Sequence, residues 1–185
     1  MNRVKGFTLV ELVIVIVVLG LLAAAALPRF LNVTDQAKQA SIEGVAGGFA
    51  TAVLSARAQW EAEARPVDAN GDNLVDYDGQ EFWLTTSSTP DYRDGYPAVV
   101  KGDETGESDS YLVTVDADRC IRLMETLLQN PPKVTLATSS ESGIKYFAEL
   151  VPNTDSVCRY TQNEGKAHYF DYDVKNGSVN VVLKD

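Results

Sequence analysis

An apolar run begins at Phe7 and continues to Leu27, and its only ionisable side chain is that of Glu11. As an α-helix the run would be roughly 30 Å long, which matches the hydrocarbon core of a bilayer. Arg3 and Lys5 directly precede it, and cationic flanks of this kind stay on the cytoplasmic side. We therefore expect the run to cross a membrane and the chain after it to lie outside the cytoplasm.

A cleaved secretory signal peptide is the alternative explanation of this N-terminus. Such a peptide has a small-residue cleavage site after its apolar run, and Ala23 to Ala26 could supply one. Two features count against it. The charge of Glu11 would cost about 2.5 to 3.5 kcal/mol near the centre of a membrane helix, somewhat less near its end, and a signal peptide does not need that charge. The helical pattern also resumes beyond Pro28 instead of stopping after the alanines.

A short motif, Gly6-Phe7-Thr8-Leu9-Val10-Glu11, opens the apolar run. It resembles the processing and assembly motif that type IV prepilins share with the pseudopilins of type II secretion. The resemblance implies that residues 1–6 are a leader, which an inner-membrane prepilin peptidase removes by cutting between Gly6 and Phe7. It also implies that the same enzyme methylates the new amino group of Phe7, and that the mature chain assembles with other pilin subunits into a filament.

Glu11 is the candidate assembly residue, because cleavage would create a cation close to it. The new α-amino group of Phe7 would be mostly protonated near neutral pH and about 6 Å from Glu11 along one helix. The resemblance implies that the amine of one subunit instead meets Glu11 of an axially displaced neighbour. The alternative is a glutamate at the membrane end that reaches back to the lipid headgroups. Loss of the leader's two cations would also change the net charge from −10 to −12.

Two stretches beyond the apolar run narrow the resemblance. Leu27 to Asn32 and Asp35 to Ala37 resemble the mannose-sensitive haemagglutinin (MSHA) branch of type IV pilins, and the chain up to Trp60 is most similar to its minor pilin. This branch implies a minor structural subunit of a pilus used for surface attachment or motility. Two alternatives stay open: a type II secretion pseudopilin, and a membrane-anchored periplasmic binding module that never polymerises.

Residues 28–65 are expected to extend the helix as an amphipathic segment beyond the membrane. The apolar side chains recur at three- and four-residue intervals, at Val45, Phe49, Ala52, Val53, Ala56 and Trp60. Pro28 lacks a backbone N–H and Gly20 lowers helix propensity, so both weaken the helix near the end of the apolar run. The resemblance implies that pilin helices lose regularity between these two positions in a filament, which makes Gly20 and Pro28 candidate assembly residues.

Residues 66–185 are expected to form a globular head, because short apolar runs alternate there with turn residues. The predicted strands are Phe82–Leu84, Ala98–Val100, Tyr111–Val115, Ile144–Leu150, Cys158–Thr161, Ala167–Val174 and Ser178–Leu183. A helix capped by Asp118 is expected to run to about Gln129, and Asn176-Gly177 predicts a two-residue hairpin turn. The fold class is therefore α+β, a long N-terminal helix packed along an antiparallel sheet, and this also resembles the type IV pilin fold.

The two cysteines, Cys120 and Cys158, lie far apart in the sequence and form no CxxC motif. We expect them to form a disulfide, which requires an oxidising compartment and therefore a head outside the cytoplasm. Closing this loop would stabilise the head by roughly 3 to 4 kcal/mol in the entropic model. The resemblance implies that the segment between the cysteines lies on the filament surface.

An acidic stretch after Pro66 could bind calcium. Oxygen ligands recur at alternate positions, as in half of an EF-hand loop, from the side chains of Asp68, Asn70, Asp72 and Asp76 and the carbonyl of Leu74. The stretch departs from the EF-hand pattern in two places, where Asn73 replaces glycine and Gly79 replaces a carboxylate. The alternative is a solvated turn, because Asp, Asn and Gly dominate turns without any metal. No cofactor is otherwise expected.

Composition and motifs argue against two other functions. A net charge of −10 and a pI near 4.5 disfavour a nucleic-acid partner, since binding to phosphates needs a basic surface. Catalysis has no support either, because the single histidine, His168, has no partner motif and the sequence has no GxSxG, P-loop or GxGxxG. The expected location is the bacterial inner membrane before assembly and an extracellular pilus afterwards, with the head in the periplasm or outside.

Overall fold

The computed structural model describes residues 7–87, 91–102, 116–139 and 141–184. The predicted leader, including Gly6, and the predicted strand Tyr111–Val115 lie outside the described residues. The chain divides into two compact units, Met1–Lys38 and Gln39–Asp185.

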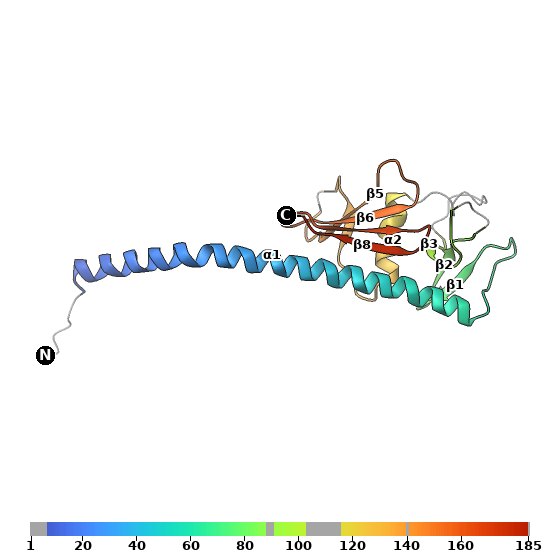
Figure 1. The fold of residues 1–185 in the computed structure, drawn as a ribbon, viewed down its shortest axis with the longest axis horizontal. Helices are drawn as coiled ribbons and strands as arrows, with labels where there is room; N and C mark the ends of the chain where they lie inside the picture. The colour runs from blue at the N-terminus through green and yellow to red at the C-terminus, as the bar shows by residue number, and fades with distance from the viewer. Residues whose placement is uncertain (1–6, 88–90, 103–115, 140, 185) are drawn as a thin grey trace. The chain divides into compact units, whose positions relative to one another are not determined.

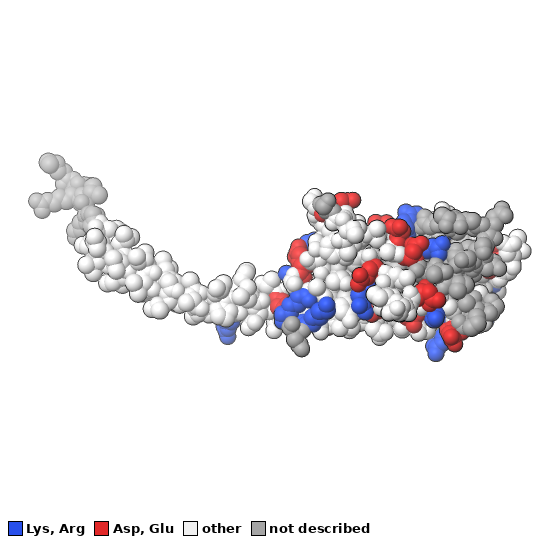
Figure 2. Space-filling view, turned by 90° about the horizontal axis from the view of Figure 1, so that it is seen from above, with Lys and Arg blue, Asp and Glu red and all other residues white. Residues whose placement is uncertain are grey.

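Helix α1 spans Leu9–Ala62 and includes Pro28 (Figure 1). In the first unit its large apolar side chains are exposed, and that part of the surface is largely uncharged in the space-filling view (Figure 2). By length and composition, α1 is able to cross a membrane. The helix ends before the predicted Arg65, because Ala64 and Arg65 adopt positive φ angles of 62° and 60° and a proline follows.

The second unit contains two sheets and one short helix. The three-stranded sheet has the order β1 (Leu74–Tyr77), β2 (Gln80–Leu84) and β3 (Pro97–Val100). Helix α2 spans Ala117–Leu127. The five-stranded sheet has the order β4 (Val134–Leu136), β5 (Tyr146–Leu150), β6 (Val157–Gln162), β7 (Tyr169–Asp173) and β8 (Ser178–Val182). The predicted α+β fold, with a long helix, antiparallel strands and a disulfide, is confirmed.

Two strands, β1 and β4, are missing from the sequence-based prediction. Strand β1 follows an Asp- and Asn-rich stretch and has a single fully buried side chain, Val75, so its apolar pattern is weak. Strand β4 is only 3 residues long and pairs parallel with β5, whereas the other strand pairs among the described residues are antiparallel. Strands this short form because a neighbouring strand completes their hydrogen bonds, which no local pattern reveals.

The core of the second unit forms where α1 packs on the five-stranded sheet. The ring of Phe49 lies 5.6 Å from that of Tyr160, 5.8 Å from Phe170 and 5.2 Å from Tyr172. The predicted apolar stripe of α1 is confirmed, because its residues from Phe49 to Trp60 are buried in this core. Val45, the first residue of the stripe, is partly buried against the core. Aromatic pairs at these distances stabilise a core beyond the area that they bury.

The start of α2 corrects the predicted cap. The N-cap residue is Asp116, whose carboxylate accepts a hydrogen bond of 2.8 Å from the backbone N–H of Arg119, whereas Asp118 lies in the first turn. An acid in the first turn interacts favourably with the helix dipole, so both aspartates suit a helix start, and only the backbone geometry separates their roles. The helix also ends at Leu127, two positions before the predicted Gln129.

The β7–β8 hairpin is confirmed, but its loop is longer than predicted. Asp173 pairs with Ser178, so residues 174–177 form a four-residue loop. Gly177 closes it with a φ of +72° and donates its N–H to the carbonyl of Asp173 at 2.8 Å. A Cβ at Gly177 would lie 2.0 Å from Cδ1 of Tyr96. The glycine therefore lets the hairpin pack directly against the segment that leads into β3.

Replacing Gly177 with alanine is expected to lower the free energy of unfolding by about 2 to 4 kcal/mol, from the positive φ and the overlap with Tyr96. Gly143→Ala is the matched control, because Gly143 has a φ of +77° but open space around its Cβ position. It is expected to cost only about 1 kcal/mol. Urea denaturation of the detergent-solubilised chain measures both, and equal effects would contradict the packing role of Gly177.

Candidate functional site: the helix N-terminus and the disulfide-bonded head

The first turn of α1 is closed by a reciprocal pair of side chains, Thr8 and Glu11. The backbone N–H and the hydroxyl of Thr8 both donate to Oε2 of Glu11, at 2.9 Å and 2.8 Å. The backbone N–H of Glu11 donates to Oγ1 of Thr8 at 3.2 Å. This arrangement is a capping box, which satisfies backbone donors that a helix start leaves without partners. It explains why the helix begins at Leu9 and not at the predicted Phe7.

Thr8 is the residue of this site that the sequence interpretation missed. Its signal is present, because Thr8-x-x-Glu11 ahead of an apolar run is the capping-box pattern. Within the single chain, Glu11 therefore caps the start of α1 together with Thr8. This function is separate from any contact of Glu11 with a neighbouring subunit. Phe7 is 86% exposed, and the Glu11 carboxylate is exposed as well. It could accept further hydrogen bonds from a cation that approaches the first turn.

Gly20 and Pro28 both lie within continuous helix in the single chain. A Cβ at Gly20 would meet no atom within 4 Å, so no close packing among the described residues explains the glycine. The loss of helical regularity expected between the two residues is absent from the described residues of the single chain. Their role in a filament stays a prediction.

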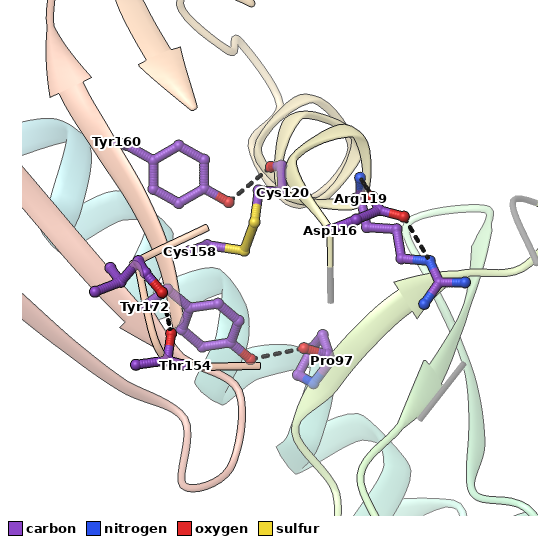
Figure 3. Close-up of a disulfide and its surroundings, with 9 residues drawn as sticks. Pro97, Asp116, Arg119, Cys120, Thr154, Cys158, Tyr160 and Tyr172 are labelled. Carbon is purple, nitrogen blue, oxygen red and sulfur yellow. Dashed lines mark hydrogen bonds and ion pairs between the residues drawn. A yellow bond between two sulfur atoms is a disulfide. The ribbon is translucent and has the colours of Figure 1, made fainter. Parts of the chain in front are cut away.

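Cys120 and Cys158 form a disulfide with a Cα–Cα distance of 5.5 Å (Figure 3). It joins α2 to β6, and both residues are fully buried. Beside it the hydroxyl of Tyr160 donates to the carbonyl of Cys120 at 2.7 Å. Burial raises the pKa of the Tyr160 phenol, so this hydroxyl keeps its proton. The predicted pairing is confirmed, and a buried hydrogen bond reinforces the same connection.

A second buried hydroxyl connects the two sheets. Tyr172 of β7 donates to the carbonyl of Pro97 in β3 at 2.7 Å (Figure 3). Burial raises the pKa of this phenol well above its usual value. A buried carbonyl needs a hydrogen-bond partner, and Tyr172 supplies one that an apolar ring could not. The head is therefore a single packed unit with a three-stranded and a five-stranded part.

The acidic stretch predicted to bind calcium is held by its own hydrogen bonds. Oδ1 of Asp68 accepts from the backbone N–H groups of Asn70 at 2.8 Å and Asp72 at 2.9 Å. Leu74 and Asp76 lie in β1, beyond the turn. In the part of the chain that the structure describes, no three His, Cys, Asp or Glu side chains are grouped so that they could hold a metal. An Asp-led turn accounts for this geometry, and calcium binding stays a prediction.

His168 is fully buried beside the start of β7. Its Nδ1 accepts a hydrogen bond of 3.0 Å from the backbone N–H of Lys184. The contact ties the end of the chain to the sheet. His168 is therefore a packed residue of the head, and this position gives no support to a catalytic role.

Comparisons with known proteins point to one family. Residues 1–27 match the model of the prokaryotic N-terminal methylation motif. The chain is similar to the type IV narrow pilus major component PilA5 of Thermus thermophilus, with 51% identity over 57 residues, which is 31% of this chain and 49% of that protein. It is also similar to the type IV major fimbrial protein FimA of Dichelobacter nodosus, with 35% identity over 86 residues, 46% of this chain and 53% of the relative. No solved structure shows significant similarity to the chain.

The similarity covers only part of each protein. The type IV major alpha-pilin of Moraxella bovis is 43% identical over 56 residues, 30% of this chain and 35% of the relative. The chain thus spans about half or less of the length of these curated relatives. The methylation motif covers residues 1–27, while the fold of the head is known from the structure.

Proposed function

We propose that this chain, which has the N-terminal methylation motif and the α+β fold of a type IV pilin, is a structural subunit of a pilus. The observation that carries the proposal is an apolar helix whose large side chains are exposed throughout the first unit and which has a carboxylate, Glu11, in its first turn. Such a helix is stable in a membrane or against other helices, and a filament supplies the second environment. The role is structural and requires no cofactor.

The proposed assembly chemistry starts with processing. A prepilin peptidase would cut between Gly6 and Phe7 and methylate the new amine, which places a cation at the end of a helix that has Glu11 in its first turn. In the assembled filament, Glu11 would pair with this amine on a neighbouring subunit. The capping box supports the idea, because it already holds the Glu11 carboxylate at the helix end.

The finer assignment is a minor pilin of an MSHA-like pilus for surface attachment or motility. It rests on the resemblance of residues 28–37 and of the chain up to Trp60. The relatives named above are described as pilus or fimbrial components, which favours a pilin over the two alternatives, a type II secretion pseudopilin and a non-polymerising anchored module. Before assembly the helix would hold the chain in the inner membrane. The buried disulfide supports a head outside the cytoplasm.

Immunogold labelling of sheared surface filaments tests this proposal, with an antibody against the head. Gold along the filaments is expected for a major subunit, and gold at rare points or at tips for a minor one. Filaments without gold, together with signal in the membrane fraction, would contradict the pilin role and favour the pseudopilin or the anchored module.

A further inference from the structure

The sequence contains two Asn-Gly pairs, Asn70-Gly71 and Asn176-Gly177. An asparagine that precedes glycine is chemically labile, because the backbone nitrogen of the glycine can attack the side-chain amide carbon and no Cβ hinders its approach. The attack requires a glycine N–H that can leave its hydrogen bond and an asparagine side chain that can rotate. The surroundings of each pair therefore decide whether it reacts.

The pair Asn70-Gly71 lies in an exposed turn that follows α1. The N–H of Gly71 donates to the carbonyl of Asp68 at 3.2 Å, and a Cβ at Gly71 would meet no described atom within 4 Å. The side-chain Nδ2 of Asn70 donates to Oδ2 of Asp68, also at 3.2 Å. Exposed turns with few buried contacts open at a low cost in free energy, so both groups can be released together.

The pair Asn176-Gly177 is held more closely. The N–H of Gly177 donates to the carbonyl of Asp173 at 2.8 Å. Both ends of the Asn176 amide are bound, since Nδ2 donates to Oδ2 of Asp173 at 2.8 Å and Oδ1 accepts from the N–H of Ser178 at 2.9 Å. The ring of Tyr96 packs against Gly177. Rotation of this side chain into the reactive position would break all three hydrogen bonds within the packed hairpin.

We propose that Asn70 is a site of spontaneous deamidation in the folded chain and that the hairpin protects Asn176. Hydroxide removes the proton of the Gly71 amide, whose nitrogen then bonds to Cγ of Asn70 while ammonia leaves, and a five-membered succinimide results. Water opens this ring at either carbonyl, which gives aspartate or isoaspartate at position 70. One water is consumed and one ammonia released for each conversion, and no enzyme or cofactor takes part. The inference is independent of the proposed function.

The conversion changes the turn that contains it. Nδ2 of Asn70 is a donor to the Asp68 carboxylate, and the product has a second carboxylate in its place. Two like charges then lie close together where a hydrogen bond was, and the net charge of the chain becomes one unit more negative. The Asp68 carboxylate also accepts from the backbone N–H groups of residue 70 and of Asp72. We therefore expect the turn to loosen as the chain ages.

Peptide mass spectrometry of the full chain in detergent tests the proposal. The folded chain is incubated at mildly alkaline pH, and digestion with pepsin in acid stops the reaction before the two asparagines are quantified. Asn70 is expected to convert at least about tenfold faster than Asn176, because its turn opens more readily. The rate at Asn70 should also rise with pH, since the attacking amide must lose its proton.

Two controls separate the effect of structure from that of sequence. In urea, where neither pair is held, Asn70 and Asn176 should convert at rates that differ less than threefold. Gly71→Ala adds a methyl group beside the attacking nitrogen, and is expected to slow conversion at Asn70 at least threefold while Asn176 stays unchanged. A folded-state ratio below tenfold would overturn the proposal. So would a rate at Asn70 that Gly71→Ala leaves unchanged, because the reaction would then not pass through the Gly71 nitrogen.

Discussion

Replacing Glu11 with leucine is expected to lower incorporation of the chain into filaments at least tenfold. The substitution removes the carboxylate that the proposed assembly pairs with the amine of a neighbouring subunit. An amine left among apolar helices without a counter-charge costs several kcal/mol, which exceeds the tenfold threshold of about 1.4 kcal/mol. Immunoblots of sheared filaments, normalised to the amount of chain in the membrane fraction, measure the effect.

Three further variants separate the charge of Glu11 from its role in the helix cap. Thr8→Ala removes the capping box but leaves the carboxylate, so it should cost about 1 kcal/mol of local helix stability and assemble better than Glu11→Leu. Glu11→Gln keeps an acceptor for Thr8 but no charge, and should assemble poorly. Leu12→Ile leaves both roles intact and should behave as the wild type. Unchanged incorporation of Glu11→Leu at equal membrane levels would disprove the pairing.

Removing the disulfide with Cys120→Ser and Cys158→Ser together is expected to lower the free energy of unfolding by about 4 kcal/mol. The bond closes a loop with a sequence separation of 38, and the entropic model assigns about 4 kcal/mol to a loop of that size. Urea denaturation of the solubilised chain measures the loss. Wild-type chain kept in reductant should show nearly the same shift.

A matched variant tests whether the bond or its surroundings carry this stability. Tyr160→Phe leaves the disulfide in place but removes the hydrogen bond to the carbonyl of Cys120, and should cost about 1 to 3 kcal/mol. If the double serine variant lost less than about 1 kcal/mol, the hydrogen bonds and the aromatic core, and not the cross-link, would hold α2 on β6.

The sequence interpretation succeeded where a local signal has one physical meaning. The apolar run with Glu11 near its start, the stripe from Phe49 to Trp60 and the hairpin around Gly177 each depend on the spacing of neighbouring residues. It was less accurate where two residues carry the same signal: Asp116 and Asp118 both suit a helix start, and only the backbone decides which one caps α2. Thr8 was missed although its capping pattern is plain in the sequence.

The sequence by itself therefore determined the long helix, its apolar and amphipathic parts, the α+β class and the two cysteines that could pair, because these follow from periodicity and residue chemistry along the chain. Only the tertiary structure decided the division into two sheets, the parallel pairing of β4 with β5 and the four-residue loop at Gly177. It also decided the contact of Tyr172 with Pro97. These features join residues that are distant in the sequence, and their stability comes from packing and hydrogen bonds that exist only once the partners meet.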